Sequence, residues 1–396
     1  MSLIQEIRRY SSDIVSEEQL VKMLEKSATE KRSLRVKFGI DPTFPDVHLG
    51  HAVPIRLLRL FQDHGHLPVL ILGDGTARLG DPTGRNDQRP PLTPEMVEEN
   101  AKTYLIQIGK VLDLSEGVCE VRRNTEWFGK MDFFDCLQLA AKSTAARLLE
   151  RDDFQKRMQA NLPVHLHEMM YPLMQGLDSV KVESDIELGG NDQLFNLHMG
   201  RQMQEREGQR PQVCITTPLL LGTDGRKMSK TYGNHVGLNA SADDMFGKVM
   251  SLSDEGMASW FSLATSMTTV EIDALLAGHP REAKDCLARA VVTEMHSAEA
   301  AAAASEEFVR RFQKKEKPSE VPEKQVAAGS YPLPSLMKSV GLANSTSEAR
   351  RLIEGGGVRI NDEVIKDVRH MIALEIGGAS VLMQAGKRRF AQISAE

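Results

Sequence analysis

Short aliphatic runs alternate with helical patterns in the first half of the chain, and this alternation limits the fold more than any other feature. LRVKFGI and LPVLILG have the length of strands, each is bounded by Gly, Pro or Asp, and a helical pattern from about residue 51 separates them. Alternation of this kind predicts an α/β fold with a parallel sheet covered by helices on both faces.

The remaining pattern divides the 396 residues into further regions. Residues from about 241 to 315 are helical in pattern and rich in Ala and Met, and KKEKPSEVPEKQ is charged and punctuated by proline. In the last region Ser347 is a plausible N-cap of a short helix that a glycine run ends. We predict a Rossmann-type domain over 1–234, a helical domain over 235–315, a linker over 316–330 and a small α+β domain over 331–396.

Composition excludes several classes of protein. The four cysteines form no CxxC pair, so neither a zinc site nor a disulfide framework is indicated. No apolar run approaches the roughly 18 residues that span a bilayer, and the acidic start is unlike a signal peptide. We therefore expect a cytoplasmic protein with no membrane partner. A formal charge of -6 argues against wholesale coating of nucleic acid, although one domain can still carry a basic face.

The segment His48-Leu49-Gly50-His51 lies where the first strand passes into a helix. Ligands of parallel sheets bind outside the carboxyl ends of the strands, and the first turn of a helix offers free N–H groups to anions. Gly50 lets a flat group approach the backbone. Two histidines three residues apart could also be metal ligands or a structural pair, but no third ligand follows at the spacing of a zinc protease.

A second cationic segment, LGTDGRKMSKTYGN, carries Lys227 and Lys230 in what otherwise resembles a loop. Its three glycines would give the loop freedom to close over a ligand. From the residues alone, an ordinary solvated basic loop is the competing interpretation.

HLGH followed far downstream by KMSK resembles the paired signature of the class I aminoacyl-tRNA synthetases. YPLMQGLDS and ELGGNDQ are similar to the Tyr-x-x-x-Gln-x-x-Asp and Gly-Gly-x-Asp-Gln segments of the tyrosyl-tRNA synthetase family, and GDPTGRNDQRPPLT fits the same family. The C-terminal region is similar to an S4 RNA-binding domain. The resemblance covers nearly the whole chain.

The resemblance implies a tyrosine–tRNA ligase that activates tyrosine with ATP and transfers it to tRNA(Tyr). Adenylation requires positioning and stabilisation of charge on the phosphates, with no covalent nucleophile. The two histidines and the two lysines then form two cationic jaws that close on one triphosphate. Mg²⁺ is implied by ATP itself, with no tightly bound metal in the protein. The family also implies a homodimer.

Individual residues receive roles only through the resemblance. The expected catalytic residues are His48, His51, Lys227, Lys230 and Thr43. The expected ATP-binding residues are Asp41, Gly50, Asp192, Lys227 and Lys230. The expected tyrosine-binding residues are Lys37, Asp81, Tyr171, Gln175, Asp178 and Gln193, with Asp178 accepting a hydrogen bond from the phenol. The expected tRNA-binding residues are Arg350, Arg351, Lys387 and Arg388.

Three positions depart from the family pattern. Lys37 occupies the place of a tyrosine found in one subgroup, Leu177 stands where an aromatic residue is frequent, and Gly75 replaces a commonly larger residue. These departures leave open an altered amino-acid specificity. A tryptophanyl-type synthetase is a second hypothesis, which Gln175 and Asp178 disfavour. A non-catalytic RNA-binding relative is a third, and it would be expected to lose residues of HLGH or KMSK.

Overall fold

The computed structural model describes residues 3–81, 92–312, 321–386 and 389–396. It divides into two compact units, residues 1–308 and 309–396, so that the division falls in the last turns of one helix, α16 (Ala298–Phe312). The predicted Rossmann-type and helical domains thus form one unit in the structure. Among the described residues, no helix has both the length and the apolar character that crossing a membrane requires.

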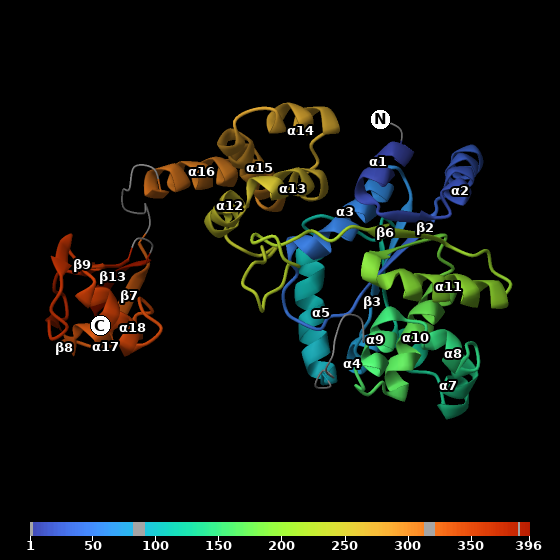
Figure 1. The fold of residues 1–396 in the computed structure, drawn as a ribbon, viewed down its shortest axis with the longest axis horizontal. Helices are drawn as coiled ribbons and strands as arrows, with labels where there is room; N and C mark the ends of the chain where they lie inside the picture. The colour runs from blue at the N-terminus through green and yellow to red at the C-terminus, as the bar shows by residue number, and fades with distance from the viewer. Residues whose placement is uncertain (1–2, 82–91, 313–320, 387–388) are drawn as a thin grey trace. The chain divides into compact units, whose positions relative to one another are not determined.

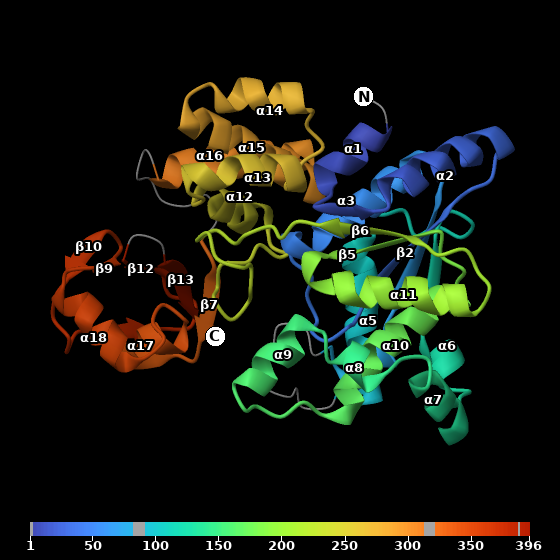
Figure 2. The same ribbon diagram turned by 45° about the vertical axis from the view of Figure 1, so that its right-hand side comes forward.

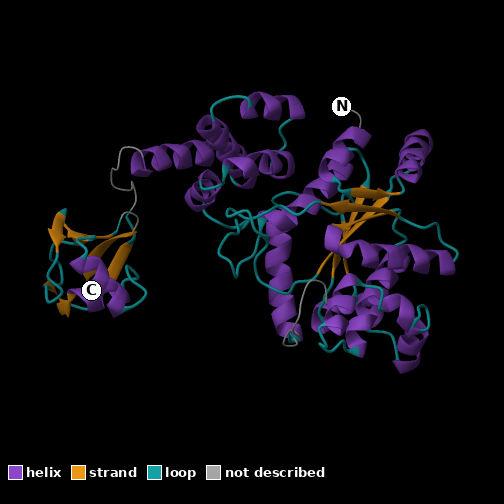
Figure 3. Ribbon diagram, in the orientation of Figure 1, coloured by secondary structure: helices purple, strands orange, loops and turns teal. Residues whose placement is uncertain are grey.

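A six-stranded sheet forms the centre of the first unit (Figures 1 and 3). Its strand order is β1-β6-β5-β2-β3-β4, and every neighbouring pair is parallel except β1 with β6. The strands are β1 (Asp13–Val15), β2 (Arg35–Ile40), β3 (Leu67–Leu72), β4 (Glu120–Arg123), β5 (Ile186–Gly190) and β6 (Val213–Thr217). The parallel part has the doubly wound order that the sequence predicts, with one antiparallel strand added at its edge.

Helices cover both faces of this sheet (Figures 1 and 3). The crossover helices α3 (Leu49–Asp63) and α5 (Pro94–Ile108) lie on one face, while α10 (Leu166–Lys181) and α11 (Leu194–Arg206) pack side by side on the other (Figure 2). The α10–α11 contact is close because Gly176 faces Met203 and the backbone of α11. The remaining helices of this part are α1 (Leu3–Tyr10), α2 (Glu17–Glu30), α4 (Thr76–Leu79), α6 (Thr125–Phe128), α7 (Phe133–Ala140), α8 (Ala145–Leu148), α9 (Asp152–Gln159) and the 3₁₀ turn η1 (Asn191–Gln193).

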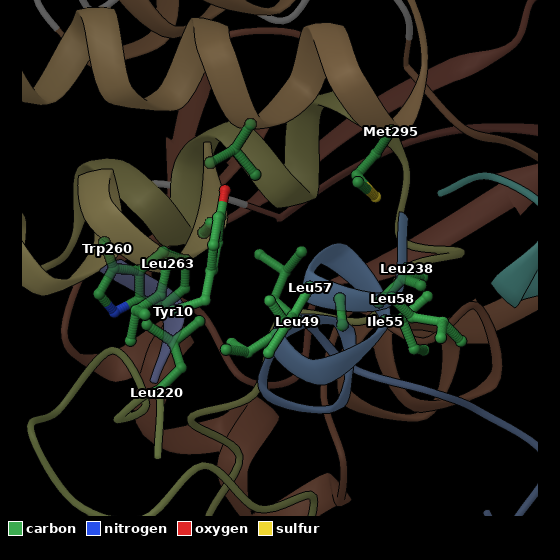
Figure 4. Packing of buried hydrophobic residues seen from close by; sticks show 14 of the residues in the cluster. Tyr10, Leu49, Ile55, Leu57, Leu58, Leu220, Leu238, Trp260, Leu263 and Met295 are labelled. Carbon is green, nitrogen blue, oxygen red and sulfur yellow. The ribbon is translucent and has the colours of Figure 1, made fainter. Parts of the chain in front are cut away.

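A layer of helices follows the sheet and packs against α1 and α3. It contains α12 (Ala242–Met250), α13 (Met257–Ala264), α14 (Thr269–Leu276), α15 (Pro280–Met295), α16 and the 3₁₀ turn η2 (Asp254–Gly256). One continuous hydrophobic core joins this layer to the sheet. Figure 4 shows Leu57 and Leu58 of α3 to the right of Trp260 and Leu263 of α13, with Met295 of α15 above them in this view. This shared core explains why the two predicted domains form one unit.

Two arginine side chains, the half-buried Arg9 and the buried Arg56, reinforce the junction. The Arg9 guanidinium donates to the carbonyl oxygens of Phe261 at 3.2 Å and Ser262 at 3.0 Å, which lie in the last turn of α13, where backbone carbonyls lack the usual helical donors. Arg56 of α3 pairs with Glu294 of α15 and donates to Ser266 Oγ at 3.1 Å. The helical layer is therefore fixed to α1 and α3 by charge as well as by apolar contact.

The second unit is a small α+β structure with its own core. Its five-stranded sheet has the order β10-β9-β12-β13-β7, and β11 pairs with β8. The elements are β7 (Glu323–Val326), β8 (Gly329–Pro332), α17 (Leu333–Ser339), α18 (Thr346–Glu354), β9 (Val358–Ile360), β10 (Glu363–Ile365), β11 (Met371–Leu374), β12 (Val381–Ala385) and β13 (Arg389–Ala395). Because β7 pairs with β13, residues 323–330 belong to this unit and the linker predicted over 316–330 is too long. The N-cap of α18 is Ser345, which accepts from Glu348 N at 3.1 Å, so the prediction of Ser347 is wrong.

Candidate active site

Strands β2 and β5 are neighbours at the point where the order of the sheet reverses. The chain leaves β2 toward β3 and leaves β5 toward β6. In sheets of this topology ligands bind in a crevice outside the carboxyl ends of two such strands, and the term crevice here means that region. Asp41 follows β2 directly, and Asp192 lies two residues after the end of β5. The HLGH segment and the GGNDQ segment are thus brought to one edge of the sheet.

The two histidines of HLGH form the first turn of α3. His48 is the N-cap residue, its N–H donates to His51 Nδ1 at 3.4 Å, and the two rings stack with centroids 3.7 Å apart. Desolvation, followed by the neighbouring charge of His51, lowers the pKa of His48 to about 2; desolvation and the charges of Lys230 and Lys227 lower the pKa of His51 to about 4. Both shifts favour neutral rings in the ligand-free site, where the His51 side chain is exposed to solvent. The cationic role of the two histidines toward a triphosphate stays a prediction.

Gly50 joins this turn to the KMSK loop. A Cβ atom at Gly50 would lie 3.0 Å from His48 Nδ1 and 3.6 Å from the sulfur of Met228. The buried Nδ1 of His48 has no hydrogen-bond partner within the described part of the chain. The backbones also meet, since Leu49 N donates to Val236 O at 2.9 Å. Glycine at position 50 thus allows the His48 ring and Met228 of the loop to pack closely at this point.

Each lysine of KMSK faces a carboxylate of the crevice. Lys230 Nζ lies 2.7 Å from Asp46 Oδ2, and Lys227 Nζ lies 3.7 Å from Asp192 Oδ2. All four side chains are at least one third exposed. Because exposed ion pairs contribute little energy, these carboxylates hold the lysines weakly over the site and a polyanion can displace them.

Buried Asn234 shapes the loop from within. Its side chain donates to Asp224 Oδ1 at 2.7 Å and to Lys227 O at 3.2 Å, and it accepts from Ser229 N at 2.8 Å. A Cβ atom at Gly222 would lie 2.4 Å from this side chain, so only glycine allows the two strands of the loop to approach. The KMSK backbone is consequently fixed at its centre, while its lysine side chains reach outward.

Asp41 connects the strand edge to α10. Its carboxylate accepts from Thr76 Oγ at 2.7 Å and from Tyr171 Oη at 2.9 Å. Burial, followed by the negative charge of Asp41, raises the pKa of Tyr171, so the phenol remains a donor. The structure thus brings together Asp41, predicted on the ATP side, and Tyr171, predicted on the amino-acid side.

Asp178 is buried beside Asn124 and Trp127. Asp178 Oδ1 accepts from the Trp127 indole at 2.9 Å, and Oδ2 accepts from Asn124 Nδ2 at 3.3 Å. Desolvation raises the pKa of Asp178 to about 7, although the charge of Lys37 and the two hydrogen bonds act in the opposite direction. The carboxylate is therefore positioned by two donors and changes its charge near neutral pH.

Gln193 and Asp81 also meet at the carboxyl edge of the sheet. Gln193 Nε2 donates to Asp81 Oδ2 at 2.8 Å, and the buried guanidinium of Arg151 lies 3.9 Å from Asp81 Oδ1. Gln175 Nε2 instead donates to Glu187 Oε1 at 3.1 Å. The described residues contain no group of three or more His, Cys, Asp or Glu side chains that could hold a metal ion.

Lys37 does not reach the crevice in this structure. Its side chain is completely buried, and its ammonium donates to Gln175 O at 3.0 Å, Ser179 Oγ at 2.7 Å and Glu187 Oε1 at 2.8 Å. The three protons of the ammonium are thereby engaged. In this structure Lys37 is therefore not placed to contact a ligand directly, as was predicted for tyrosine.

The departures at positions 75 and 177 have different surroundings. Gly75 N donates to Asn124 Oδ1 at 2.8 Å, and a Cβ atom at Gly75 would lie 2.9 Å from that same oxygen and 3.2 Å from Phe128. Leu177 is buried in the cluster that contains Trp127 and Leu173. Glycine at 75 therefore permits Asn124 to pack directly against the turn, whereas Leu177 is part of the hydrophobic wall.

The predicted tRNA-binding residues lie in the second unit. Arg350 and Arg351 are exposed on α18. Lys387 and Arg388 lie outside the described residues. Arg389 pairs with Glu348 at 2.9 Å, so one further cation is fixed near this helix.

Several residues of the site were missed by the sequence analysis. Asn124 and Thr76 link Asp178 to Asp41 by hydrogen bonds, since Asn124 Nδ2 also donates to Thr76 Oγ at 3.0 Å. Asn124 is the first residue after β4, so the general position of ligands beyond the carboxyl ends of parallel strands is a signal that could have found it. Nothing in the local sequence distinguishes Glu187, whose importance depends on its burial.

Comparison with family models places the chain in a known group. Residues 29–313 match the model described as tRNA synthetases class I (W and Y), and residues 332–374 match the S4 domain. A tyrosine–tRNA ligase from Idiomarina loihiensis is 47% identical over 99% of this chain and 97% of the relative. Another from Moorella thermoacetica is 46% identical over 98% of this chain and 94% of the relative.

Solved structures agree with this at the level of the fold. A C-terminally truncated mitochondrial tyrosyl-tRNA synthetase from Aspergillus nidulans is 23% identical with a TM-score of 0.65, covering 78% of this chain and 94% of that one. A tyrosyl-tRNA synthetase from Archaeoglobus fulgidus, crystallised with L-tyrosine, is also 23% identical with a TM-score of 0.61, covering 76% and 98%. The family matches and the full-length identities lead to one conclusion: the chain belongs to the tyrosyl-tRNA synthetases, a family of class I tRNA synthetases.

Proposed function

We propose that the crevice at the ends of β2 and β5 activates tyrosine with ATP, and that the enzyme then transfers tyrosine to tRNA(Tyr). The observation that carries this proposal is the contact between the HLGH turn and the KMSK loop. A chain of hydrogen bonds from Asp41 through Thr76 and Asn124 to Asp178 also connects the predicted ATP side to the predicted amino-acid side. The full-length similarity to tyrosine–tRNA ligases supports the same reaction.

The nucleotide side supplies donors to the phosphates. An oxygen of the tyrosine carboxylate attacks the α-phosphorus, the bond to the bridging oxygen breaks, and pyrophosphate leaves with the additional negative charge. The neutral His48 and His51 rings and the first turn of α3 would donate to the phosphates, and Lys227 and Lys230 would follow the departing charge. Asp41, Thr43 and Gly50 would line this side, with Asp192 binding the ribose. Displacing the lysines from Asp46 and Asp192 has a small energetic cost.

The amino-acid side explains selection of the phenol. Asp178 would accept a hydrogen bond from the tyrosine hydroxyl, while Asp81, Tyr171, Gln175 and Gln193 would surround the ammonium and carboxylate. Phenylalanine lacks the hydroxyl, so its binding would leave the buried carboxylate without a partner. In sites of this kind kcat/KM for such an analogue is lower by as much as about 10⁴ to 10⁵. The fixed donors Asn124 and Trp127 orient the Asp178 carboxylate for this task.

Mg²⁺ would enter the site as part of the ATP substrate. Magnesium uses phosphate oxygens and water for most of its ligands, and requires few from the protein. Asp46 and Asp192 are the exposed carboxylates nearest to the KMSK lysines, and they would become available when the lysines move to the phosphates. The bound Mg²⁺ would neutralise part of the negative charge of the triphosphate.

The other regions would bind tRNA. The predicted division assigns the anticodon side to the helical region of about 235–315 and phosphate contacts to the S4-like unit. The exposed Arg350 and Arg351 on α18 support this role, because basic side chains on one face suit recognition of RNA by shape and phosphate position.

A homodimer would cover an apolar surface on α7. Phe133 and Phe134 are 71% and 70% exposed, Leu137 is 50% exposed, and Leu166 at the start of the adjacent α10 is 82% exposed. Large apolar side chains gathered on one surface mark an interface. A second copy of the chain that packs on this surface would also place two active sites in one molecule.

Exchange of radioactive pyrophosphate into ATP tests the proposal directly. We expect tyrosine to stimulate exchange in the purified protein and phenylalanine and tryptophan to do so far less. Stimulation by tryptophan or phenylalanine without stimulation by tyrosine would instead indicate an altered specificity. The absence of exchange with all twenty amino acids would leave a non-catalytic relative as the explanation.

A further inference from the structure

A closed cluster of polar side chains lies beneath the turn of α10 that carries Gln175 and Asp178. Its centre is the ion pair of Lys37 on β2 with Glu187 on β5, whose Nζ and Oε1 atoms are 2.8 Å apart. The side chains are 0% and 1% exposed. The two strands are neighbours in the sheet, and Lys37 is directly opposite Glu187 in the register. The pair therefore lies on the face of the sheet that α10 and α11 cover.

All the hydrogen-bonding capacity of the pair is used within the protein. Lys37 Nζ donates to Glu187 Oε1, Ser179 Oγ and Gln175 O. Glu187 Oε1 also accepts from Gln175 Nε2 at 3.1 Å, and its Oε2 accepts from Ser179 Oγ at 2.9 Å and from Gln212 Nε2. A carboxylate has about four acceptor positions, and here four donors occupy them. Such a fully satisfied network is rigid and specifies one arrangement.

The cluster is also closed on the side of α11. A Cβ atom at Gly200 would lie 2.5 Å from Gln212 Nε2, 2.9 Å from Ser179 Oγ and 3.1 Å from Glu187 Oε2. The glycine therefore allows α11 to cover the ion pair without inserting a side chain. Neither water nor a ligand of the crevice reaches Lys37 in this arrangement, because its exposed fraction is zero.

Two contacts connect this cluster to residues that face the substrate. Lys37 and Glu187 hold both the backbone oxygen and the side-chain amide of Gln175, which fixes where that side chain lies. Ser179, which bridges the ion pair, directly follows Asp178 in the same turn of α10. Lys37 also contributes the positive charge that favours the ionised form of Asp178.

We propose that Lys37 and Glu187 are positioning residues for tyrosine, which act through Gln175 and Asp178 without touching the substrate and which determine the preference for tyrosine over phenylalanine. This inference depends on the proposed function of the crevice. It replaces the direct contact expected for Lys37 with an indirect one, and it gives Glu187, Ser179 and Gln212 a role in selectivity. The nucleotide side has no contact with this cluster in the described residues, so its binding of ATP should be independent of it.

Ser179→Ala offers the mildest test, because it removes the bridging hydroxyl and leaves both charges in place. Ser305→Ala is a matched control: Ser305 is 1% exposed, donates to Asp285 at 2.9 Å and accepts from Arg289, but lies in the helical layer. Both substitutions therefore remove a buried hydroxyl from between a cation and a carboxylate. A general effect on folding would appear in both variants, and an effect on tyrosine only in the first.

Pyrophosphate exchange by the full-length protein would measure KM for tyrosine, KM for ATP and the ratio of kcat/KM for tyrosine and phenylalanine. We expect Ser179→Ala to raise KM for tyrosine by about fivefold, or about 1 kcal/mol, and to leave KM for ATP unchanged. Lys37→Met/Glu187→Gln, which removes both charges together, should also lower the tyrosine-to-phenylalanine ratio by about tenfold or more. Ser305→Ala should leave all three quantities unchanged.

Equal changes in the two KM values, or an unchanged KM for tyrosine in Ser179→Ala, would overturn the positioning role. The same holds if Ser305→Ala reproduces the effect. If the double variant does not fold, the comparison of the two serine variants still decides the question. A wild-type protein without tyrosine-dependent exchange would refute the proposed function itself, which is a distinct result.

Discussion

At the residue scale, Asp178 shows how burial and hydrogen bonding oppose each other in one carboxylate. Burial favours the neutral acid, while Lys37, Asn124 and Trp127 favour the ion, and the resulting pKa is about 7. A carboxylate that accepts from a phenol binds it more strongly when ionised, since hydrogen bonds to charged groups are the stronger ones. The charge of Asp178 should therefore change kcat/KM for tyrosine more than kcat/KM for phenylalanine.

This balance predicts a pH dependence of tyrosine selection. A raised pKa means that Asp178 is protonated below about pH 7 and ionised above it, so kcat/KM for tyrosine should rise as the pH increases through 7. Pyrophosphate exchange between pH 6 and 8.5 would measure it, with phenylalanine as the comparison. Asp178→Asn should remove the rise and lower kcat/KM for tyrosine by about 100-fold, as loss of a charged hydrogen bond of about 3 kcal/mol would do. A profile identical in Asp178→Asn and wild type would contradict this assignment.

The sequence could name candidate site residues but not their contacts. Asp41 and Asp192 received their roles through the family resemblance, and the structure places both just after strands, which is a local property. The lowered pKa values of His48 and His51 depend on the folded surroundings and on lysines about 180 residues away, which no local pattern contains. Lys37 and Glu187 are separated by 150 residues, and a lysine in a strand ordinarily indicates an exposed face.

At the element scale, the KMSK loop combines a fixed centre with a glycine turn at each end. Gly225 and Gly233 have φ values of 78° and 66°, which side chains with a Cβ rarely adopt, so these glycines allow the turns at its two ends. Asn234 then fixes the backbone of the loop between them. The backbone positions from which the two lysine side chains extend toward the phosphates are consequently fixed.

Asn234→Ala should impair catalysis in the same way as Lys230→Ala. Loss of the buried amide removes the hydrogen bonds with Lys227 O and Ser229 N, so the loop backbone that carries the two lysines would no longer be held in one position. We expect kcat for exchange to fall by about tenfold to 100-fold in each variant, with little change in KM for tyrosine. A rise in KM for tyrosine as large as the fall in kcat would indicate a general disturbance of the fold.

Prediction of elements succeeded where the periodic pattern was long. The first strand, the following helix and the second strand match β2, α3 and β3, although α3 begins at Leu49 and the expectation was about residue 51. Short strands were harder: β7 has four residues in a charged, proline-containing segment, and it forms because β13 offers a parallel edge. Its pairing depends on residues almost 70 positions later.

At the scale of the whole molecule, the two units have separate cores. The nucleotide and amino-acid residues all belong to the first unit, and Arg350 and Arg351 belong to the second. On the proposed assignments, activation of tyrosine belongs to the first unit alone, and the second unit contributes only to the binding of tRNA.

A chain that ends at residue 315 should therefore retain tyrosine-dependent pyrophosphate exchange. Its charging of tRNA should fall by at least about tenfold, because the basic side chains of the second unit would be missing. Exchange and aminoacylation measured on the same preparation would separate the two effects. The cut precedes β7, because a cut at residue 325 would leave part of a strand behind. Undiminished charging would refute the role of the second unit in tRNA binding.

Helix α3 connects the HLGH turn of the site to the helical layer of the first unit. Its first turn carries His48 and His51, and its second turn is tied by Arg56 to Glu294 and Ser266 of the helical layer. Pro54 lies between these two contacts and removes one backbone hydrogen bond from the helix. If a partner of the helical layer displaces α3 and so changes the affinity of the first turn for nucleotide, nucleotide must change the affinity for that partner by the same factor. Arg56 is then the residue through which the two binding events would be coupled.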